Sequence, residues 1–182
     1  MIKNPTFITS NFFKSKQLSW HLGIELDHVA FDAPEIQSLS LAEVVEYKAK
    51  SAFKVVDGPV LVEDTSLVFH AIGQLPGPLI KWFFKELGNQ GLCRLLDNYN
   101  DRSATATVLF GYYDGQKLVT FSGESTGSIA KSPKGKEGFG WDPIFIPKGH
   151  DKTWGEMSKK EQAETSIRRI ALKKLEKYLH SK

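Results

Sequence analysis

A short apolar run that ends in two acids constrains this chain more than any other stretch. Residues 58–62, Gly-Pro-Val-Leu-Val, are typical of a buried strand, because a β-branched run follows a turn dipeptide. Glu63 and Asp64 come next, where we expect this strand to end. Sheet proteins bind ligands beyond the carboxyl ends of their strands, so the position favours a functional acid pair. The alternative is that the two acids only mark the point where the strand leaves the core.

A proline-rich turn and a helical pattern follow the acid pair. The turn, Leu75-Pro76-Gly77-Pro78, contains two prolines whose rings fix φ. The helix expected after the turn carries Lys81 near its start, and we expect this lysine to return over the edge that holds the acids. Carboxylates faced by a lysine indicate a site for a metal ion and phosphate groups.

Strand and helix patterns alternate along the chain and predict an α/β fold. Residues 6–9 and 103–130 follow strand periodicity, and the Asp114-Gly115 turn divides the second stretch into a hairpin. Capping boxes and apolar periodicity predict one helix over residues 41–56 and a second, continuous helix over residues 159–179. No linker or internal repeat divides the chain, so we expect residues 1–182 to form a single domain.

The composition excludes several classes of protein. Hydrophobic residues at 41% and charged residues at 25% are the proportions of a globular protein. No apolar run approaches the roughly 20 residues of a membrane helix, and the N-terminal residues lack the apolar centre of a signal peptide. Cys93 is the only cysteine, which excludes an internal disulfide and a thiolate-rich zinc site. We therefore expect a cytoplasmic protein without a membrane partner. The net charge of +3 is too small to predict binding to nucleic acid.

The first strand leads directly into a potential anion site. Ser10 and Asn11 follow the strand and supply a helix N-cap, and Lys14 lies one turn inside the helix. The free N–H groups of the first turn and the charge of the lysine together favour an anion. Many strand-to-helix turns carry the same residues with nothing bound, so the pattern alone is a weak indication.

Three further positions suggest binding of phosphate or base. Glu35 follows a proline in a loop, and Lys48 begins on the inward side of the helix over residues 41–56. Lys48 either extends outward along its own stem or serves a function. In the glycine-rich loop at residues 132–143, Phe139 and Trp141 are spaced to flank a flat ring. The alternative for this stretch is a floppy surface loop.

If the expected strands share one sheet, the loops that carry these residues converge on one cleft. Two or three carboxylates would then hold Mg²⁺, a hard cation that prefers oxygen ligands, while lysines and backbone N–H groups would neutralise phosphates. A water that is bound to the metal or oriented by Asp64 would be the nucleophile.

In order and spacing, these motifs resemble those of the inosine triphosphate pyrophosphatase family over essentially the whole chain. They comprise a phosphate loop, an acidic loop, the strand with its two acids, the proline turn with its lysine, the glycine-rich loop and a threonine–glutamate segment. The motifs are Thr9-Ser10-Asn11-Phe12-Phe13-Lys14, Pro34-Glu35-Ile36-Gln37, Val62-Glu63-Asp64-Thr65-Ser66-Leu67, Leu75-Pro76-Gly77-Pro78 with Lys81-Trp82-Phe83, Gly138-Phe139-Gly140-Trp141-Asp142-Pro143, and Lys152-Thr153 with Glu156-Met157. Because several irregular motifs agree, the resemblance is specific.

The resemblance implies a reaction. A nucleoside triphosphate would be hydrolysed between its α- and β-phosphates, with Mg²⁺ as cofactor, to a nucleoside monophosphate and pyrophosphate. The substrates implied are non-canonical purine nucleotides such as ITP, dITP and XTP, whose removal is a house-cleaning activity. The resemblance also implies a homodimer of α/β subunits, each with an elongated mixed sheet flanked by helices and two lobes around a central nucleotide cleft.

The same resemblance implies roles for individual residues. Asp64 would accept a proton and, with Glu35, bind the metal. Phe139 would stack on the base, and Arg168 would help to read the purine oxygen. The expected substrate-binding residues are Thr9, Ser10, Asn11, Lys14, Lys48, Thr65, Lys81, Phe139, Gly140, Trp141, Asp142, Gln162 and Arg168.

Three positions depart from the family pattern. Ser10 replaces a loop glycine, which is a mild change. Gln162 replaces a lysine that contacts the base, and Ile167 replaces a histidine. A missing donor to a buried purine oxygen costs roughly 1–3 kcal/mol, so we expect a shifted or relaxed base preference. Ile167 also has a simpler interpretation, since it continues the apolar stripe of the last helix.

Two other functions compete with this one. A catalytically impaired nucleotide-binding sensor of the same fold would retain the phosphate site, although a mere binder has little need for Glu35 and Asp64. A nucleic-acid-binding module is disfavoured because the aromatic residues are not interleaved with a basic stripe. The preferred base, the sugar and the number of metal ions stay open at this point.

Overall fold

The computed structural model describes residues 4–9, 12–31 and 36–181 of the chain. The chain forms two compact units. Unit 1 comprises Met1–Asp64, Val108–Gly123 and Arg168–Lys182, and unit 2 comprises Thr65–Thr107 and Glu124–Ile167. In the part of the chain that is described, no helix is both long and apolar enough to span a membrane.

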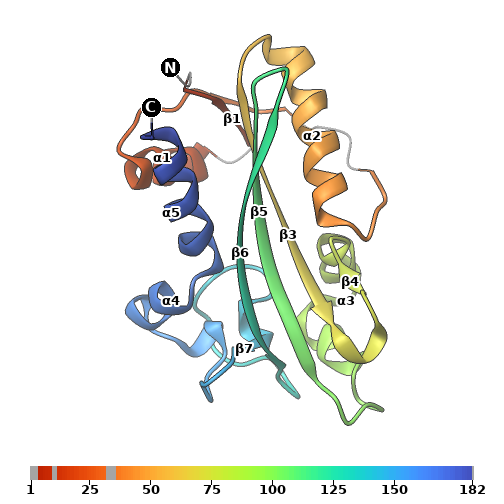
Figure 1. The fold of residues 1–182 in the computed structure, drawn as a ribbon. Coiled ribbons are helices and arrows are strands. Elements are labelled where there is room, and N and C mark those ends of the chain that lie inside the picture. The colour runs from red at the N-terminus through yellow and green to blue at the C-terminus, as the bar shows by residue number, and fades with distance from the viewer. Residues whose placement is uncertain (1–3, 10–11, 32–35, 182) are drawn as a thin grey trace. The chain divides into compact units, whose positions relative to one another are not determined.

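The described residues form a mixed sheet accompanied by helices (Figure 1). The strands are β1 (Thr6–Ile8), β2 (His28–Val29), β3 (Val60–Phe69), β4 (Pro76–Gly77), β5 (Ser103–Tyr113), β6 (Leu118–Ile129) and β7 (Phe145–Pro147). The α-helices are α1 (Phe12–Leu22), α2 (Leu41–Val56), α3 (Ile80–Arg94), α4 (Lys159–Thr165) and α5 (Ile167–Leu179), and the 3₁₀ helices are η1 (His70–Ile72), η2 (Asp142–Ile144) and η3 (Trp154–Glu156).

Both parallel and antiparallel pairs occur in the sheet. The strand order is β2-β1-β3-β5-β6-β7, and β4 pairs with β3 outside this path. β1 is parallel to β2 and to β3, whereas β4 is antiparallel to β3 and β7 to β6. A mixed sheet flanked by helices confirms the α/β class predicted from the sequence.

The core of unit 1 forms between α2 and one face of the sheet. Val45, Ala49 and Ala52 of α2 are fully buried with Val60 and Val62 of β3. Small side chains on α2 let the helix axis approach the strands, and the β-branched valines fill the pleated surface opposite. Val60 and Val62 of β3 therefore face α2.

The opposite face of the unit 1 strands is covered by α5. Figure 1 shows α2 and α5 on opposite sides of β3, β5 and β6. Leu172 and Leu175 of α5 are buried, and the ring of Tyr178 lies 5.7 Å from Tyr112 and 5.3 Å from Phe121. Leu175 and Tyr178 belong to the apolar stripe that the helical periodicity predicts, whereas Ile170 of the same predicted stripe is 40% exposed and Leu172 is buried instead.

In unit 2, one arginine joins the end of α3 to the end of β6. The side chain of Arg102 donates hydrogen bonds to the carbonyls of Cys93, Leu96, Ile129 and Ala130 at 2.8 to 3.0 Å. The arginine thus satisfies carbonyls that the two elements leave open at their ends.

β3 is longer than the sequence pattern predicts. We expected the strand to end at the acids, but it continues past them to Phe69. Leu67 and Phe69 are fully buried, so the strand alternation resumes beyond the acids. The acids still lie past a strand end, because β1 pairs only with Val60 and Leu61 of β3.

The last helix is broken where we predicted a continuous one. α4 ends at Thr165, α5 begins at Ile167, and Ser166 between them has ψ of 114°, which is extended backbone. Serine and threonine side chains compete for backbone hydrogen bonds and favour helix ends. The hydroxyl of Thr165 bonds in this way to the carbonyl of Glu161 at 3.2 Å.

Candidate active site

The two acids of β3 point to opposite faces of the sheet, because strand side chains alternate. Asp64 shares the face of Val62 and therefore meets α2. Glu63 shares the face of Leu61 and meets α5. The two carboxylates thus enter different environments, although they are neighbours in the chain.

Lys48 of α2 is bound to both residues of the acid pair. Its Nζ donates to the Asp64 carboxylate at 3.2 Å and to the main-chain carbonyl of Glu63 at 3.1 Å. The side chains of Lys48 and Asp64 are only 17% and 18% exposed, so the lysine does not extend to solvent. The outward-extending interpretation of Lys48 is thereby contradicted, whereas a role for Lys48 in binding phosphate stays a prediction.

Glu63 forms an ion pair with Arg168 of α5. Its Oε2 lies 2.6 Å from a guanidinium nitrogen of Arg168, and the two side chains are 10% and 29% exposed. The guanidinium also lies 5.7 Å from the centre of the Phe110 ring. The structure therefore pairs Arg168, which we expected to read the base, with the carboxylate next to Asp64.

The described residues supply only part of a magnesium site. Across residues 4–9, 12–31 and 36–181, no three or more His, Cys, Asp or Glu side chains are arranged to hold a metal ion. Asp64 offers the carboxylate chemistry that Mg²⁺ prefers, and both it and Glu63 form ion pairs, with Lys48 and Arg168 respectively. Glu35, the other expected ligand, lies outside the described residues. Asp64 thus fits a magnesium site that Glu35 would have to complete.

The expected phosphate loop is described only at its edges. The main-chain N–H of Thr9 donates to the carbonyl of Val29 at 3.1 Å, which continues the pairing of β1 with β2. Ser10 and Asn11 lie outside the described residues. Lys14, whose backbone alone is described, occupies the first turn of α1. The predicted strand and the helix that follows it are confirmed.

In unit 2, Lys81 lies in the first turn of α3 as predicted. Its Nζ is 5.5 Å from the centre of the Trp82 ring, and Nζ of Lys85 is 5.6 Å from the same ring. Thr65 is the first residue of unit 2 and is half-buried in β3. Two ammonium groups of the first two turns of α3 thus lie near the Trp82 ring, and binding of phosphate by Lys81 stays a prediction.

The glycine-rich loop folds into a tight turn around Asp142. The Asp142 carboxylate accepts a hydrogen bond from the N–H of Phe139 at 2.6 Å, and the N–H of Asp142 donates to the carbonyl of Phe139. Burial raises the pKa of Asp142 to about 6, against the lowering effect of that hydrogen bond. Phe139 is 82% exposed, so its ring is presented to solvent and available to stack. The loop is ordered by its own contacts, which contradicts the floppy-loop alternative.

Trp141 and Gln162 both contact Trp154. The rings of Trp141 and Trp154 lie 5.7 Å apart, and Phe145 lies 4.5 Å from Trp154. The Gln162 side chain donates to the carbonyl of Trp154 at 2.6 Å. Ile167 is 8% exposed and packs in the interior, as its apolar interpretation predicts.

Comparison with known proteins assigns the chain to a family. The sequence profile of the Ham1 family matches residues 6–178. The chain belongs to the Ham1 family. It is 40% identical over 172 residues to the dITP/XTP pyrophosphatase of Methanopyrus kandleri, with 92% of each chain covered. It is 42% identical over 180 residues to the inosine triphosphate pyrophosphatase of Tuber melanosporum, with 96% of each covered.

A solved structure of a Ham1 protein has the same fold. The Ham1 protein from Coxiella burnetii superposes with a TM-score of 0.85 at 25% sequence identity, covering 99% of this chain and 100% of that one. The family resemblance inferred from the motifs is thereby confirmed.

Two residues that contact the glycine-rich loop, Asn89 and Trp154, were not predicted from the sequence. Asn89 follows Gly88, where α3 is kinked (φ 61°, ψ −178°), and its side-chain amide donates to the carbonyl of Gly140 at 2.9 Å. Trp154 is buried at the centre of an aromatic cluster. A helix-breaking glycine before Asn89 was a signal for a special backbone position, but nothing in the sequence indicates its partner.

Proposed function

We propose that this Ham1-family chain is a nucleoside triphosphate pyrophosphatase. It hydrolyses non-canonical purine nucleotides such as ITP, dITP and XTP between the α- and β-phosphates, giving the monophosphate and pyrophosphate. The observation that carries the proposal is Lys48, held between the Asp64 carboxylate and the Glu63 carbonyl just beyond the end of β1. The names of relatives that match over nine-tenths of the chain support the same activity.

The division of labour follows from the chemistry of the side chains. Asp64 orients the attacking water and takes its proton while the P–O bond to the leaving pyrophosphate breaks. Lys48 stays against Asp64 and neutralises phosphate oxygens, as do Lys14 and Lys81 from the first turns of α1 and α3. Asp64 and Glu35 would hold Mg²⁺, which when bound neutralises the triphosphate and acidifies a coordinated water.

The remaining assignments are parts of the same proposal. Phe139 stacks on the face of the base, and the turn formed by residues 139–142 contacts the edge of the base. Thr9, Ser10, Asn11 and Thr65 bind phosphate oxygens. The chain acts as a single cytoplasmic domain and assembles as a homodimer.

The direct test is a panel of triphosphates. Purified protein is mixed with ITP, XTP, GTP and ATP, and pyrophosphate is measured with Mg²⁺ and with excess chelator. We expect pyrophosphate release that requires Mg²⁺ and is fastest for ITP or XTP. Orthophosphate as the sole product would contradict the cleavage site, and saturable binding without any product would favour the sensor.

Asp64→Asn tests the proposed proton acceptor. The amide can still accept the hydrogen bond from Lys48, so the fold should persist while the rate falls by about a hundredfold or more. Asp57→Asn is a matched control, since Asp57 is an exposed C-cap of α2 whose φ of 52° asparagine also adopts. If Asp64→Asn released pyrophosphate as fast as the Asp57→Asn control, Asp64 would not be the proton acceptor.

A further inference from the structure

Gln162, which the family resemblance implied to be a substrate-binding residue, is hydrogen-bonded to the backbone of this chain. Nε2 of Gln162 donates to the main-chain carbonyl of Trp154 at 2.6 Å. A primary amide donates only through its nitrogen, so this bond fixes the direction of the side chain. Gln162 therefore points its donor at the backbone of η3.

A second bond joins the same helix to the same tryptophan. The indole N–H of Trp154 donates to the hydroxyl of Thr165 at 2.8 Å. Gln162 and Thr165 are three residues apart on α4 and thus share one face of the helix. One of them holds the backbone of Trp154, and the other holds its ring.

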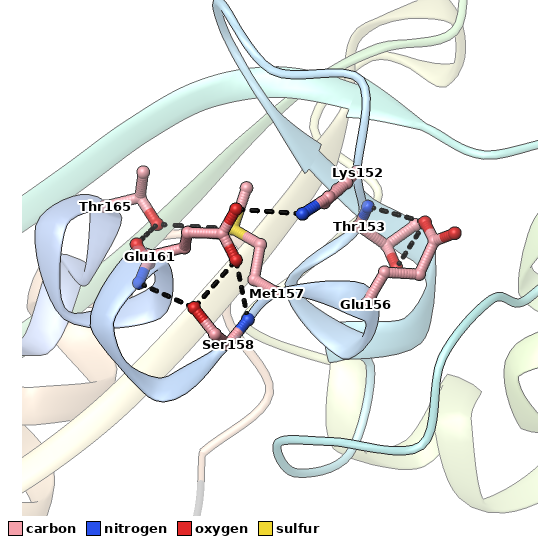
Figure 2. A network of polar contacts seen from close by, with 7 residues as sticks. All are labelled: Lys152, Thr153, Glu156, Met157, Ser158, Glu161 and Thr165. Atoms are coloured by element: carbon pink, nitrogen blue, oxygen red, sulfur yellow. Dashed lines mark hydrogen bonds and ion pairs between the residues drawn. The ribbon is translucent and has the colours of Figure 1, made fainter.

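The segment before α4 fixes the helix in place (Figure 2). Glu161 completes a capping box with Ser158 and forms an ion pair with Lys152 at 2.9 Å. The hydrogen bonds from Lys152 and Ser158 lower the pKa of Glu161 to about 2. The beginning of α4 is consequently anchored to residues 152–158, the segment that contains Trp154.

Trp154 in turn contacts the glycine-rich loop. Its ring lies 5.7 Å from Trp141, and the carbonyl of Gly155 accepts a hydrogen bond from the N–H of Glu137 at 3.0 Å. A Cβ at Gly135 would collide with the carbonyl of Gly155, so the loop and η3 approach each other closely. A displacement of Trp154 would therefore shift the loop that carries Phe139.

We propose that Gln162 is a positioning residue that, with Thr165, holds Trp154 against Trp141 and so fixes the base-binding loop, and that it does not itself read the base. The inference rests on the proposed function, because it assigns the turn around Phe139 to the base. It predicts that replacing Gln162 weakens the binding of every nucleotide to the same extent. Replacing a residue that contacts the base would instead change the preference among bases.

The test compares Gln162→Leu with Thr165→Val, which removes at nearly constant volume the hydroxyl that accepts from the indole and donates to the carbonyl of Glu161. Near-UV circular dichroism is recorded without ligand, and KM and kcat are measured for ITP, XTP, GTP and ATP. We expect both variants to alter the tryptophan signal and to raise KM about three- to tenfold for each nucleotide, with kcat unchanged. Thr165→Ser keeps the hydroxyl and should restore both readouts, and the exposed Glu164→Gln is the control.

Two results would overturn the inference. One is a Gln162→Leu variant whose loss differs between bases while Thr165→Val behaves as wild type, because Gln162 would then read the base directly. The other is an unchanged tryptophan signal in both variants. If no nucleotide is turned over, the proposed function fails, while the circular dichroism of the free protein still decides whether Gln162 and Thr165 position Trp154.

Discussion

At the scale of single residues, Glu63 and Asp64 acquire different roles because they lie on opposite faces of β3. Asp64 pairs with Lys48 at 3.2 Å on the α2 side, and Glu63 pairs with Arg168 at 2.6 Å on the α5 side. Removing one partner of a half-buried ion pair leaves the other charge uncompensated. Each acid is thus maintained by a different helix.

Asp142 gives a prediction about stability and pH. Its pKa of about 6 is raised by burial, so the folded chain binds a proton there that the unfolded chain releases between about pH 4 and 6. Stability should therefore fall as the pH rises through this range. In Asp142→Asn the side-chain amide is uncharged and can accept the same bond from Phe139. The free energy of unfolding of this variant should exceed that of the wild type by about 1–2 kcal/mol at pH 8, after allowance for the partial exposure of Asp142, and should equal it near pH 4.

Urea unfolding at pH 4 and pH 8 measures this difference. Asp151→Asn changes an exposed aspartate in the same unit and should have no effect at either pH. An Asp142→Asn variant that is less stable at pH 8 would mean that the folded chain favours the charged carboxylate.

At the scale of elements, the fit of α2 on the sheet depends on a glycine in β5. A Cβ at Gly111 would lie 2.6 Å from a methyl group of Val45 and 3.3 Å from one of Val62. The helix that carries Lys48 consequently approaches β5 more closely than any side chain there would allow.

Gly111→Ala should therefore destabilise the chain by about 1–3 kcal/mol through overpacking. Gly58→Ala is the matched control, because the nearest atom beyond its chain neighbours is 4.0 Å from the added Cβ. Combining Gly111→Ala with Val45→Ala should remove part of the destabilisation that Gly111→Ala causes. Urea unfolding of the two single variants and the double variant measures this difference. Strictly additive losses would show that Gly111 and Val45 are not in close contact.

At the scale of the whole molecule, the two units share three strands. β3 passes from unit 1 to unit 2 after Asp64, and β5 and β6 also contribute residues to both. Elements that are covalently continuous and hydrogen-bonded along their length tend to unfold together. If the chain is a single domain, as we expect from the sequence, both units should unfold in one cooperative transition.

We expect one unfolding transition for the chain. Trp82, Trp141 and Trp154 lie in unit 2, so fluorescence of a Trp20→Phe variant reports on that unit alone, and far-UV circular dichroism reports on both. Trp20 is 86% exposed, and its replacement should not disturb the fold. The two urea midpoints should coincide, and two separate midpoints would mean that the units unfold independently.

Sequence patterns predicted much of the fold, because those patterns act locally. The cap at Ser40 set the start of α2, the Asp114-Gly115 turn set the hairpin of β5 and β6, and the order of motifs identified the family. The extension of β3 to Phe69 was not predicted, and neither was the break at Ser166. Thr165 and Ser166 signalled it, but the apolar stripe on either side outweighed them in the periodicity.

The sequence by itself determined which residue types are present, their periodicity and their caps, and hence the fold class and the kind of chemistry that the motifs can perform. Only the tertiary structure decided partners: Lys48 with Asp64, Arg168 with Glu63, and Gln162 with Trp154. The physical reason is that periodicity and capping act over a few residues, whereas a side chain's partner is chosen when distant elements pack and each half-buried polar group must be satisfied.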